Sequence, residues 1–412
     1  MHCALKKMNI FFKKHKYTLL FAFLALLLLA VLIVPNTVAA FANGSGSDLE
    51  YQFTRSIDDI LRELDLGALE EFINSLNPEQ ATVFGATNAF ERIRMIVSGE
   101  IALDYASFFT YILSVLGINL VAFLPFMLSI LAIAISINIV SSLKSRIASE
   151  SVSNIVSFVG VALISTILAV QLMGILNGAR GMIGGIQSQM NTVFPVMLTL
   201  MAASGAVNSA AVYRPAVAVL SSGMLNLIAN IILPIFIVTN VFSVVGNLSD
   251  TVRLKKMSRF FTIGSRWILA TAFFLFMAFL SVQGITASIH DGVSVRTARF
   301  AINRYVPIIG GYLSEGFNLI MAGSSLVKNA VGFTAIIILF LNVLPVIIQT
   351  VIFTLSLHLT AAIAEPLGEK KVSDILSGVG KNMNILIATL IGTTFLYFIF
   401  IILVIATGNP SL

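Results

Sequence analysis

The sequence predicts an all-α polytopic membrane protein with six transmembrane helices arranged as three hairpins. Hydrophobic residues make up 58% of the chain and charged residues 11%, whereas soluble domains carry about 25% charged residues. Six apolar stretches of about 20 residues or more follow residue 100, and each is long enough to cross a bilayer as a helix. A Leu-Pro pair recurs inside three of these stretches, and a basic loop closes each of the three.

The three Leu-Pro pairs mark the first helix of each predicted hairpin. Their prolines are Pro125, Pro234 and Pro345, in the apolar runs 108–143, 216–248 and 331–364. A proline inside a helix removes one backbone hydrogen bond, and neighbouring helices or water can replace it. A second apolar stretch follows each basic loop, at 155–176, 267–289 and 385–406. We therefore expect proline-broken helices, each paired with the next apolar stretch.

Residues 1–42 have the features of an export signal. Five lysines precede an apolar core at 17–34, and Ala40-Phe41-Ala42 matches a signal peptidase cleavage site. The core is 18 residues long, against the usual run of about 7–15, so an uncleaved anchor is the alternative to a cleaved signal peptide. In both cases the chain leaves the cytoplasm by residue 43.

Residues 43–107 form a small acidic region, which we expect to be extracytoplasmic and helical. It holds 12 of the 19 acidic residues of the chain and only four basic ones. Three short segments follow helical spacing, beginning near Ser56, Leu69 and Phe90. Two interpretations stay open: a cap that packs on its own membrane domain, or a docking surface for another protein.

Basic residues orient the membrane domain, residues 108–412. The loops 144–154, 250–266 and 365–384 carry ten lysines and arginines, whereas 177–215 and 290–330 carry six. Cytoplasmic loops are enriched in lysine and arginine, so the first three are predicted to be cytoplasmic and the other two extracytoplasmic.

Residues 155–266 and 267–378 are predicted to be a tandem repeat. Asn191-x-x-x-Pro195 recurs 112 positions later as Asn303-x-x-x-Pro307, although a chance match of common residue types would give the same pattern. The apolar but broken segments around Pro195 and Pro307 could be re-entrant pieces or helices lying at the membrane surface.

No catalytic or cofactor-binding pattern occurs in the sequence, so we expect a protein that is not an enzyme and needs no cofactor. Gly380-Lys381 lacks the rest of a phosphate-binding loop, and Cys3 is the only cysteine. The apolar runs contain no charged residue, and the polar ones include Asn226 and Asn230, four apart on one helical face. The prolines together with this Asn pair are the candidate structural or conduit positions.

One segment resembles a known family. Residues 290–316, from His290-Asp291-Gly292 to Glu315-Gly316, together with Lys328-Asn329-Ala330-Val331-Gly332, are similar to the stage III sporulation protein AE family of endospore-forming bacteria. The resemblance implies a multi-pass protein of the mother-cell membrane around the forespore. It also implies partners: the other proteins of the stage III sporulation A operon, among them a secretion-type ATPase, and indirectly the forespore stage II sporulation protein Q. Arg296, Arg299 and Arg304 are the candidate partner-facing residues, and nucleic acid is not an expected partner.

The expected function is therefore that of a permease-like, non-enzymatic subunit of a channel or secretion-like complex between mother cell and forespore. A self-sufficient secondary transporter is one alternative, which the predicted repeat favours and the uncharged spans oppose. A structural membrane scaffold is the other.

Overall fold

The computed structural model describes residues 57–62, 67–74, 78, 80, 88–98, 105–142, 150–248, 254–305, 310–367 and 370–407. All regular elements in these ranges are helices. The predicted signal peptide at 1–42 lies outside them, and so does Pro307.

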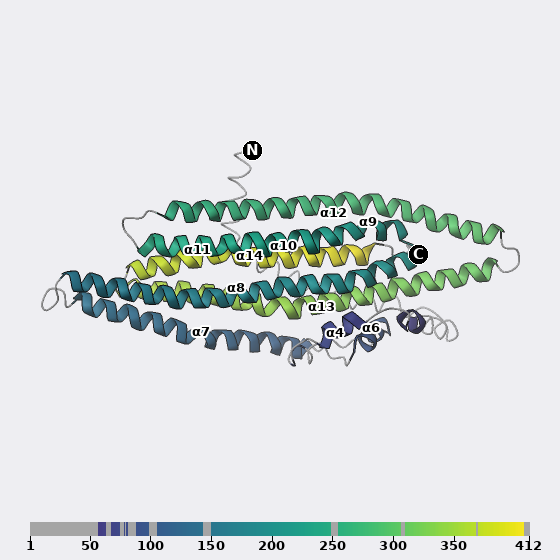
Figure 1. Cartoon of the computed structure of the whole chain (residues 1–412). Helices are drawn as coiled ribbons and strands as arrows, with labels where there is room; N and C mark the ends of the chain where they lie inside the picture. The colour runs from purple at the N-terminus through teal and green to yellow at the C-terminus, as the bar shows by residue number, and fades with distance from the viewer. Residues whose placement is uncertain are drawn as a thin grey trace.

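Six long helical rods make up the bundle (Figure 1), and by length and composition each could cross a membrane. They are α7 (Tyr105–Ser142), α8 (Glu150–Ala203), the rod from α9 (Val207–Ala218) to α11 (Leu233–Leu248), α12 (Lys255–Tyr305), α13 (Gly310–Ala364) and α14 (Lys370–Ala406). Consecutive rods run in opposite directions, and their connections lie at alternate ends of the bundle.

Three of the rods are far longer than a bilayer is thick. α8 has 54 residues, α12 has 51 and α13 has 55. At about 1.5 Å per residue they are roughly 75–85 Å long, against a bilayer core of about 30 Å. The expected short re-entrant or interfacial piece at 194–203 is therefore wrong as a separate element, because these residues are the last turns of α8.

Gly205 makes the tight turn between α8 and α9 possible. Its φ of 92° lies in the left-handed region, which glycine adopts without a Cβ clash. The Ala206 amide donates to the Met201 carbonyl and the Gly205 amide to that of Ala202, both at 3.0 Å. These are the two hydrogen bonds of a Schellman motif, which ends a helix by satisfying its last carbonyls.

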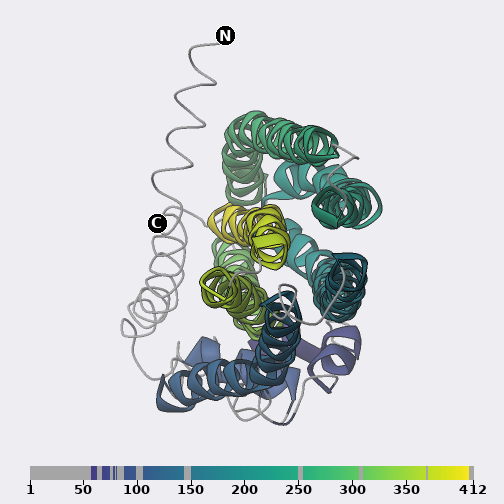
Figure 2. The same cartoon turned by 90° about the vertical axis from the view of Figure 1, so that its left-hand side faces the viewer.

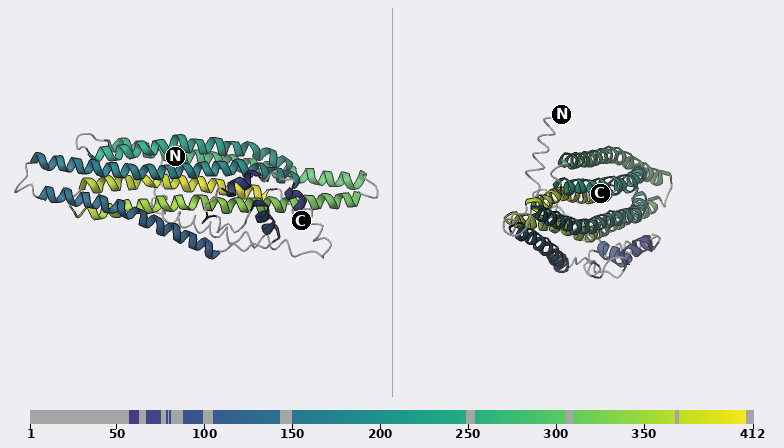
Figure 3. Two further views of the ribbon diagram at one scale, coloured as in Figure 1. Left: turned by 60° about the horizontal axis from the view of Figure 1, so that its bottom comes forward. Right: turned by 60° about the vertical axis from the view of Figure 1, so that its left-hand side comes forward.

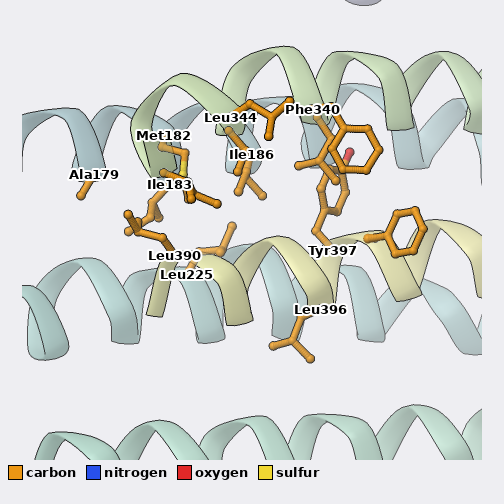
Figure 4. Packing of buried hydrophobic residues seen from close by; sticks show 14 of the residues in the cluster. Ala179, Met182, Ile183, Ile186, Leu225, Phe340, Leu344, Leu390, Leu396 and Tyr397 are labelled. Atoms are coloured by element: carbon orange, nitrogen blue, oxygen red, sulfur yellow. The ribbon is translucent and has the colours of Figure 1, made fainter. Parts of the chain in front are cut away.

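Helices α13 and α14 form the centre of the bundle. In the most apolar stretch of α13, 78% of the residues are buried, against 22% in α12. Seen along the bundle, α14 and α13 lie between the other rods (Figure 2). Side chains from α8, α10 (Leu225–Leu227), α13 and α14 fill the space between them (Figure 4). Apolar packing thus holds the middle of the bundle together.

The described part of the acidic region packs against the bundle. Its helices α4 (Gly67–Asn74) and α6 (Ala89–Ser98) contact α8 and α13, respectively, and lie along their side (Figure 3). Glu70 Oε2 accepts a hydrogen bond of 2.7 Å from the Ala89 amide, and Asn88 Oδ1 accepts one from the Glu91 amide. These side chains cap the start of α6. The described part of the region thus packs on its own bundle, while docking of another protein stays a prediction.

Candidate functional site in the proline-containing bundle

Pro345 lies where the acidic region meets the central helix. Because it has no amide hydrogen, it leaves the carbonyl of Leu341, four residues earlier, without its helical partner. Gln80 Nε2 donates to this carbonyl at 2.7 Å. The Tyr111 hydroxyl lies 3.5 Å from the same oxygen. Side chains from the acidic region and from α7 therefore replace the hydrogen bond that the proline removes.

Pro125 and Pro195 also lie within helical rods. α7 continues through Pro125 and α8 through Pro195, so neither helix is broken there. Ser129 and Thr199 each donate a hydroxyl hydrogen bond to the carbonyl of the proline one turn earlier, at 2.7 and 2.9 Å. Neighbouring helices stabilise a proline inside a helix, although the proline cannot donate a backbone hydrogen bond.

Pro234 differs from them, because it follows two π-helical segments. These are η2 (Val219–Met224) and η3 (Ile228–Ile232), on either side of α10. Pro234 is the second residue of α11. π segments are rare and frequently mark functional sites.

Asn226 and Asn230 face outward. Both side chains are exposed, and Asn226 Nδ2 donates to the Ser222 carbonyl of its own helix at 2.6 Å. They share one face, as their spacing predicts, but that face does not point into the bundle. A conduit through a single chain would therefore not be lined by this pair.

The sequence shows Asn342 and Gln349 as polar residues of an apolar run, but it did not indicate Gln189 or which amides face the centre. Gln189 is fully buried and donates to the Ala335 carbonyl at 2.6 Å, while its Oε1 has no partner among the described residues. Asn342 Nδ2 is likewise buried without a partner. Gly185 of α8 lies directly against Asn342, and Gly178 lies 3.5 Å from the Gln349 amide oxygen, measured from an ideal Cβ. The glycines make room on α8 for the amides of α13.

Lys328 is the one lysine among the largest fully buried side chains of the described part. Its Nζ donates a hydrogen bond to the Thr407 carbonyl at the end of α14. A cation at this position interacts favourably with the negative end of the helix dipole. Because Lys328 directly precedes a long apolar run, the sequence could have indicated that this lysine is buried. It was instead counted with the extracytoplasmic segment 290–330.

The arginines predicted to face a partner belong to the last turns of α12. The side chains of Arg296, Arg299 and Arg304 lie outside the described part of the chain, so their role stays a prediction. No group of three or more metal-ligating side chains occurs among the described residues.

Comparison with known proteins gives one family. The model of the family "Stage III sporulation protein AE" matches residues 87–408. A relative of that name from Bacillus subtilis (strain 168) is 27% identical over 237 residues, which cover 58% of this chain and 59% of the relative. The alignment thus spans about three fifths of the relative's length. No solved structure matches the chain.

Proposed function

Because the chain belongs to the stage III sporulation protein AE family, we propose that it is a non-enzymatic, permease-like subunit of a channel or secretion-like complex in endospore formation. The complex would lie between mother cell and forespore, with this chain in the mother-cell membrane. The match over residues 87–408 carries the proposal, since it includes all six rods.

The architecture supports a subunit that extends beyond the lipid. Rods of roughly 75–85 Å exceed the hydrocarbon core by more than a factor of two, so part of the bundle would project from the membrane. The acidic region covers this bundle from the side, near the α8–α9 turn (Figure 1). Such a projection would offer a surface to partners in the space between the two membranes.

A self-sufficient transporter has less support. Transporters of that kind keep a polar site near the middle of the bilayer, between helices. The corresponding space between α8, α13 and α14 is filled mostly by apolar side chains, among them Ile186, Leu344 and Leu390 (Figure 4). The amides of Gln189 and Asn342 lie beside them between α8 and α13. A substrate path would therefore have to involve other subunits.

Deletion and complementation in an endospore-forming bacterium test the proposal. Cells without the gene should complete engulfment but yield few heat-resistant spores, and the wild-type gene should restore them. A tagged chain purified in mild detergent from sporulating cells should bring the secretion-type ATPase and other proteins of the operon with it. Normal spore yield in the deletion strain, or purification of the chain alone, would contradict the proposal.

A separate assay distinguishes the subunit from the two alternatives. Solute flux by the purified chain alone in lipid vesicles would favour the self-sufficient transporter. Full spore yield after Pro345→Ala combined with Pro234→Ala would favour the scaffold, since a scaffold needs only a stable bundle.

A further inference from the structure

The rod from α9 to α11 changes its outward face along its length. Ala211 of α9 is exposed. On an unbroken α-helix, Asn240 would lie about eight full turns after Ala211 and would face the same way. In the structure Asn240 is only 3% exposed, whereas Val241 is 52% exposed and Val245 41%. The outward face has therefore moved by about one or two positions along the sequence.

The two π segments η2 and η3 account for this shift. A π turn closes its hydrogen bond one residue later than an α turn, so each segment takes up about one extra residue. Together they rotate the rest of the rod relative to a continuous α-helix. Without them, the polar row of α11 would point outward. Instead it points into the bundle, and its residues are Thr239, Asn240, Ser243 and Asn247.

This polar row meets α14 near the end of the bundle that carries the basic loops (Figure 1). Asn382 Nδ2 of α14 donates to Asn240 Oδ1 at 3.4 Å. An ideal Cβ at Gly378 would lie 2.6 Å from Ser243 Oγ and 3.6 Å from the side-chain nitrogen of Asn247, so a glycine is needed for this approach. We call the contact the polar seam, formed by Thr239, Asn240, Ser243 and Asn247 of α11 with Gly378 and Asn382 of α14.

Few bonds hold the polar seam closed. The side chains of Thr239, Asn240 and Asn247 donate to carbonyls one turn earlier in their own helix, at 2.8, 2.9 and 2.7 Å. Among the residues of the seam, the long contact from Asn382 to Asn240 is the one hydrogen bond that joins the two helices. Separation would break that bond and leave the others intact. Water then hydrates the amides and hydroxyls, which costs less than exposing apolar side chains.

Helix α11 is held more firmly to the start of α12. Ser258 Oγ of α12 donates to the Thr239 carbonyl at 3.1 Å. The rings of Phe242 and Phe261 stack with their centroids 5.6 Å apart. The two helices follow each other in the chain and form a hairpin. α11 and the first part of α12 can therefore move as one unit.

A pivot for this unit lies further from the basic loops. Segment η3 on one side and Gly392 of α14 on the other are both about ten residues, or roughly 15 Å, from the contact between Asn240 and Asn382. There Phe273 of α12 packs directly against Gly392, since an ideal Cβ at Gly392 would overlap its ring. η3 contacts α12 as well. Pro234 follows η3 directly, and bends in helices concentrate at prolines and π segments.

We propose that α11 and the first part of α12 swing away from α14 about this pivot, so that the polar seam opens to water at the end with the basic loops. The contacts of α14 with α13, on the opposite side of α14, stay closed. The π segments serve this motion twice, because they turn the polar row inward and provide the bend. The proposal concerns the single chain and does not depend on the proposed function.

Cysteine accessibility tests the opening. In a Cys3→Ser background, Asn382→Cys in the full chain in lipid nanodiscs should react with a water-soluble maleimide. Met383→Cys is the matched control at the same height, because Met383 is fully buried on the face where Gly380 meets α13. Asn382→Cys should react at least about tenfold faster than this control. Equal rates, or no reaction at either position, would overturn the proposal. Asn240→Cys gives the same test from α11 should Asn382→Cys fail to fold.

Cross-links separate a hinge from a loosely packed bundle. In Ser243→Cys with Gly378→Cys, the new Cβ lies 2.6 Å from the facing Oγ position, close enough for a disulfide. Oxidation should slow amide hydrogen exchange of residues 239–247 at least about tenfold relative to the reduced pair. Phe273→Cys with Gly392→Cys, joined by a short thiol cross-linker at the pivot, is the control and should leave this exchange unchanged. No effect of the first cross-link, or an equal effect of both, would contradict the hinge.

Discussion

Gln80 and Pro345 are coupled through one carbonyl group. Because Gln80 donates to the Leu341 oxygen that Pro345 leaves without a partner, Gln80→Ala exposes a polar group to an apolar surrounding. We expect the variant to lose about 1–3 kcal/mol of stability. Thermal unfolding of the purified chain in detergent measures the change.

The double variant is the control for this pair. Alanine at position 345 restores an amide hydrogen for Leu341, so Gln80→Ala should cost much less when combined with Pro345→Ala. A double-mutant cycle measures this coupling. Additive losses would show that Gln80 stabilises the chain independently of the proline.

Neighbouring glycines of α8 should respond differently to the same substitution. At Gly185 an added Cβ would overlap the Asn342 amide, whereas at Gly184 it would meet nothing within 4 Å. Gly185→Ala should therefore destabilise the chain by about 1–3 kcal/mol, and Gly184→Ala should leave the stability of the single chain unchanged. Thermal unfolding of the two variants side by side tests this, and equal losses would contradict the α8–α13 contact.

The sequence predicted close helix approach at these glycines but not its direction. Helical spacing alone does not tell which side of α8 faces the centre, because its apolar residues continue around the helix near Gly174. The buried amides Gln189 and Asn342 show the inner side, and they could be identified only with α13 in place. For the same reason, the outward direction of Asn226 and Asn230 did not follow from their spacing.

At the scale of elements, the sequence predicted six apolar helices, but the predicted ends of α8, α12 and α13 were wrong. The segment 177–193 is rich in glycine and polar residues, and their low helix propensity predicts a loop. In the structure it continues α8, because one side of it packs along α13. Tertiary packing stabilises helices more than propensity does.

The tandem repeat stays a prediction. Its 112-residue offset pairs Pro195 with Pro307, but the first helices of the two units, α8 and α12, end at Ala203 and Tyr305, 102 positions apart. Pro195 lies inside α8, whereas Pro307 lies outside the described residues. The equivalence of these two prolines therefore stays a prediction as well.

Lys328 should stabilise the last turn of α14. Lys328→Met keeps the length of the side chain but removes the donor to the Thr407 carbonyl, so the last turn of α14 loses its cap. Hydrogen exchange should become faster for amides of residues 403–406. Lys381→Met, on the exposed side of α14 near its start, should leave this exchange unchanged, and an effect of equal size would exclude a local cap.

At the scale of the whole molecule, alternating connections constrain the orientation in the membrane. The connections after α7, α11 and α13 lie at one end of the bundle, and the turn between α8 and α9 lies at the other (Figure 1). The first group coincides with the basic loops. The positive-inside bias then predicts that this end is cytoplasmic, with the acidic region and the α8–α9 turn on the opposite side.

Single cysteines in a Cys3→Ser background test this orientation with an impermeant maleimide on intact cells. Val207→Cys, at the start of α9 and 58% exposed, should react at once. Ser145→Cys, between α7 and α8, should react only after the membrane is permeabilised.

Ser258, although it lies beside a basic loop, is a poor reporter because its side chain is buried and donates to the Thr239 carbonyl. Phe274→Cys is the control for lipid burial and should react only after denaturation. Immediate reaction of Ser145→Cys with protection of Val207→Cys would reverse the orientation. In that case the acidic region and the α8–α9 turn would face the cytoplasm, and the bundle could not project toward the forespore.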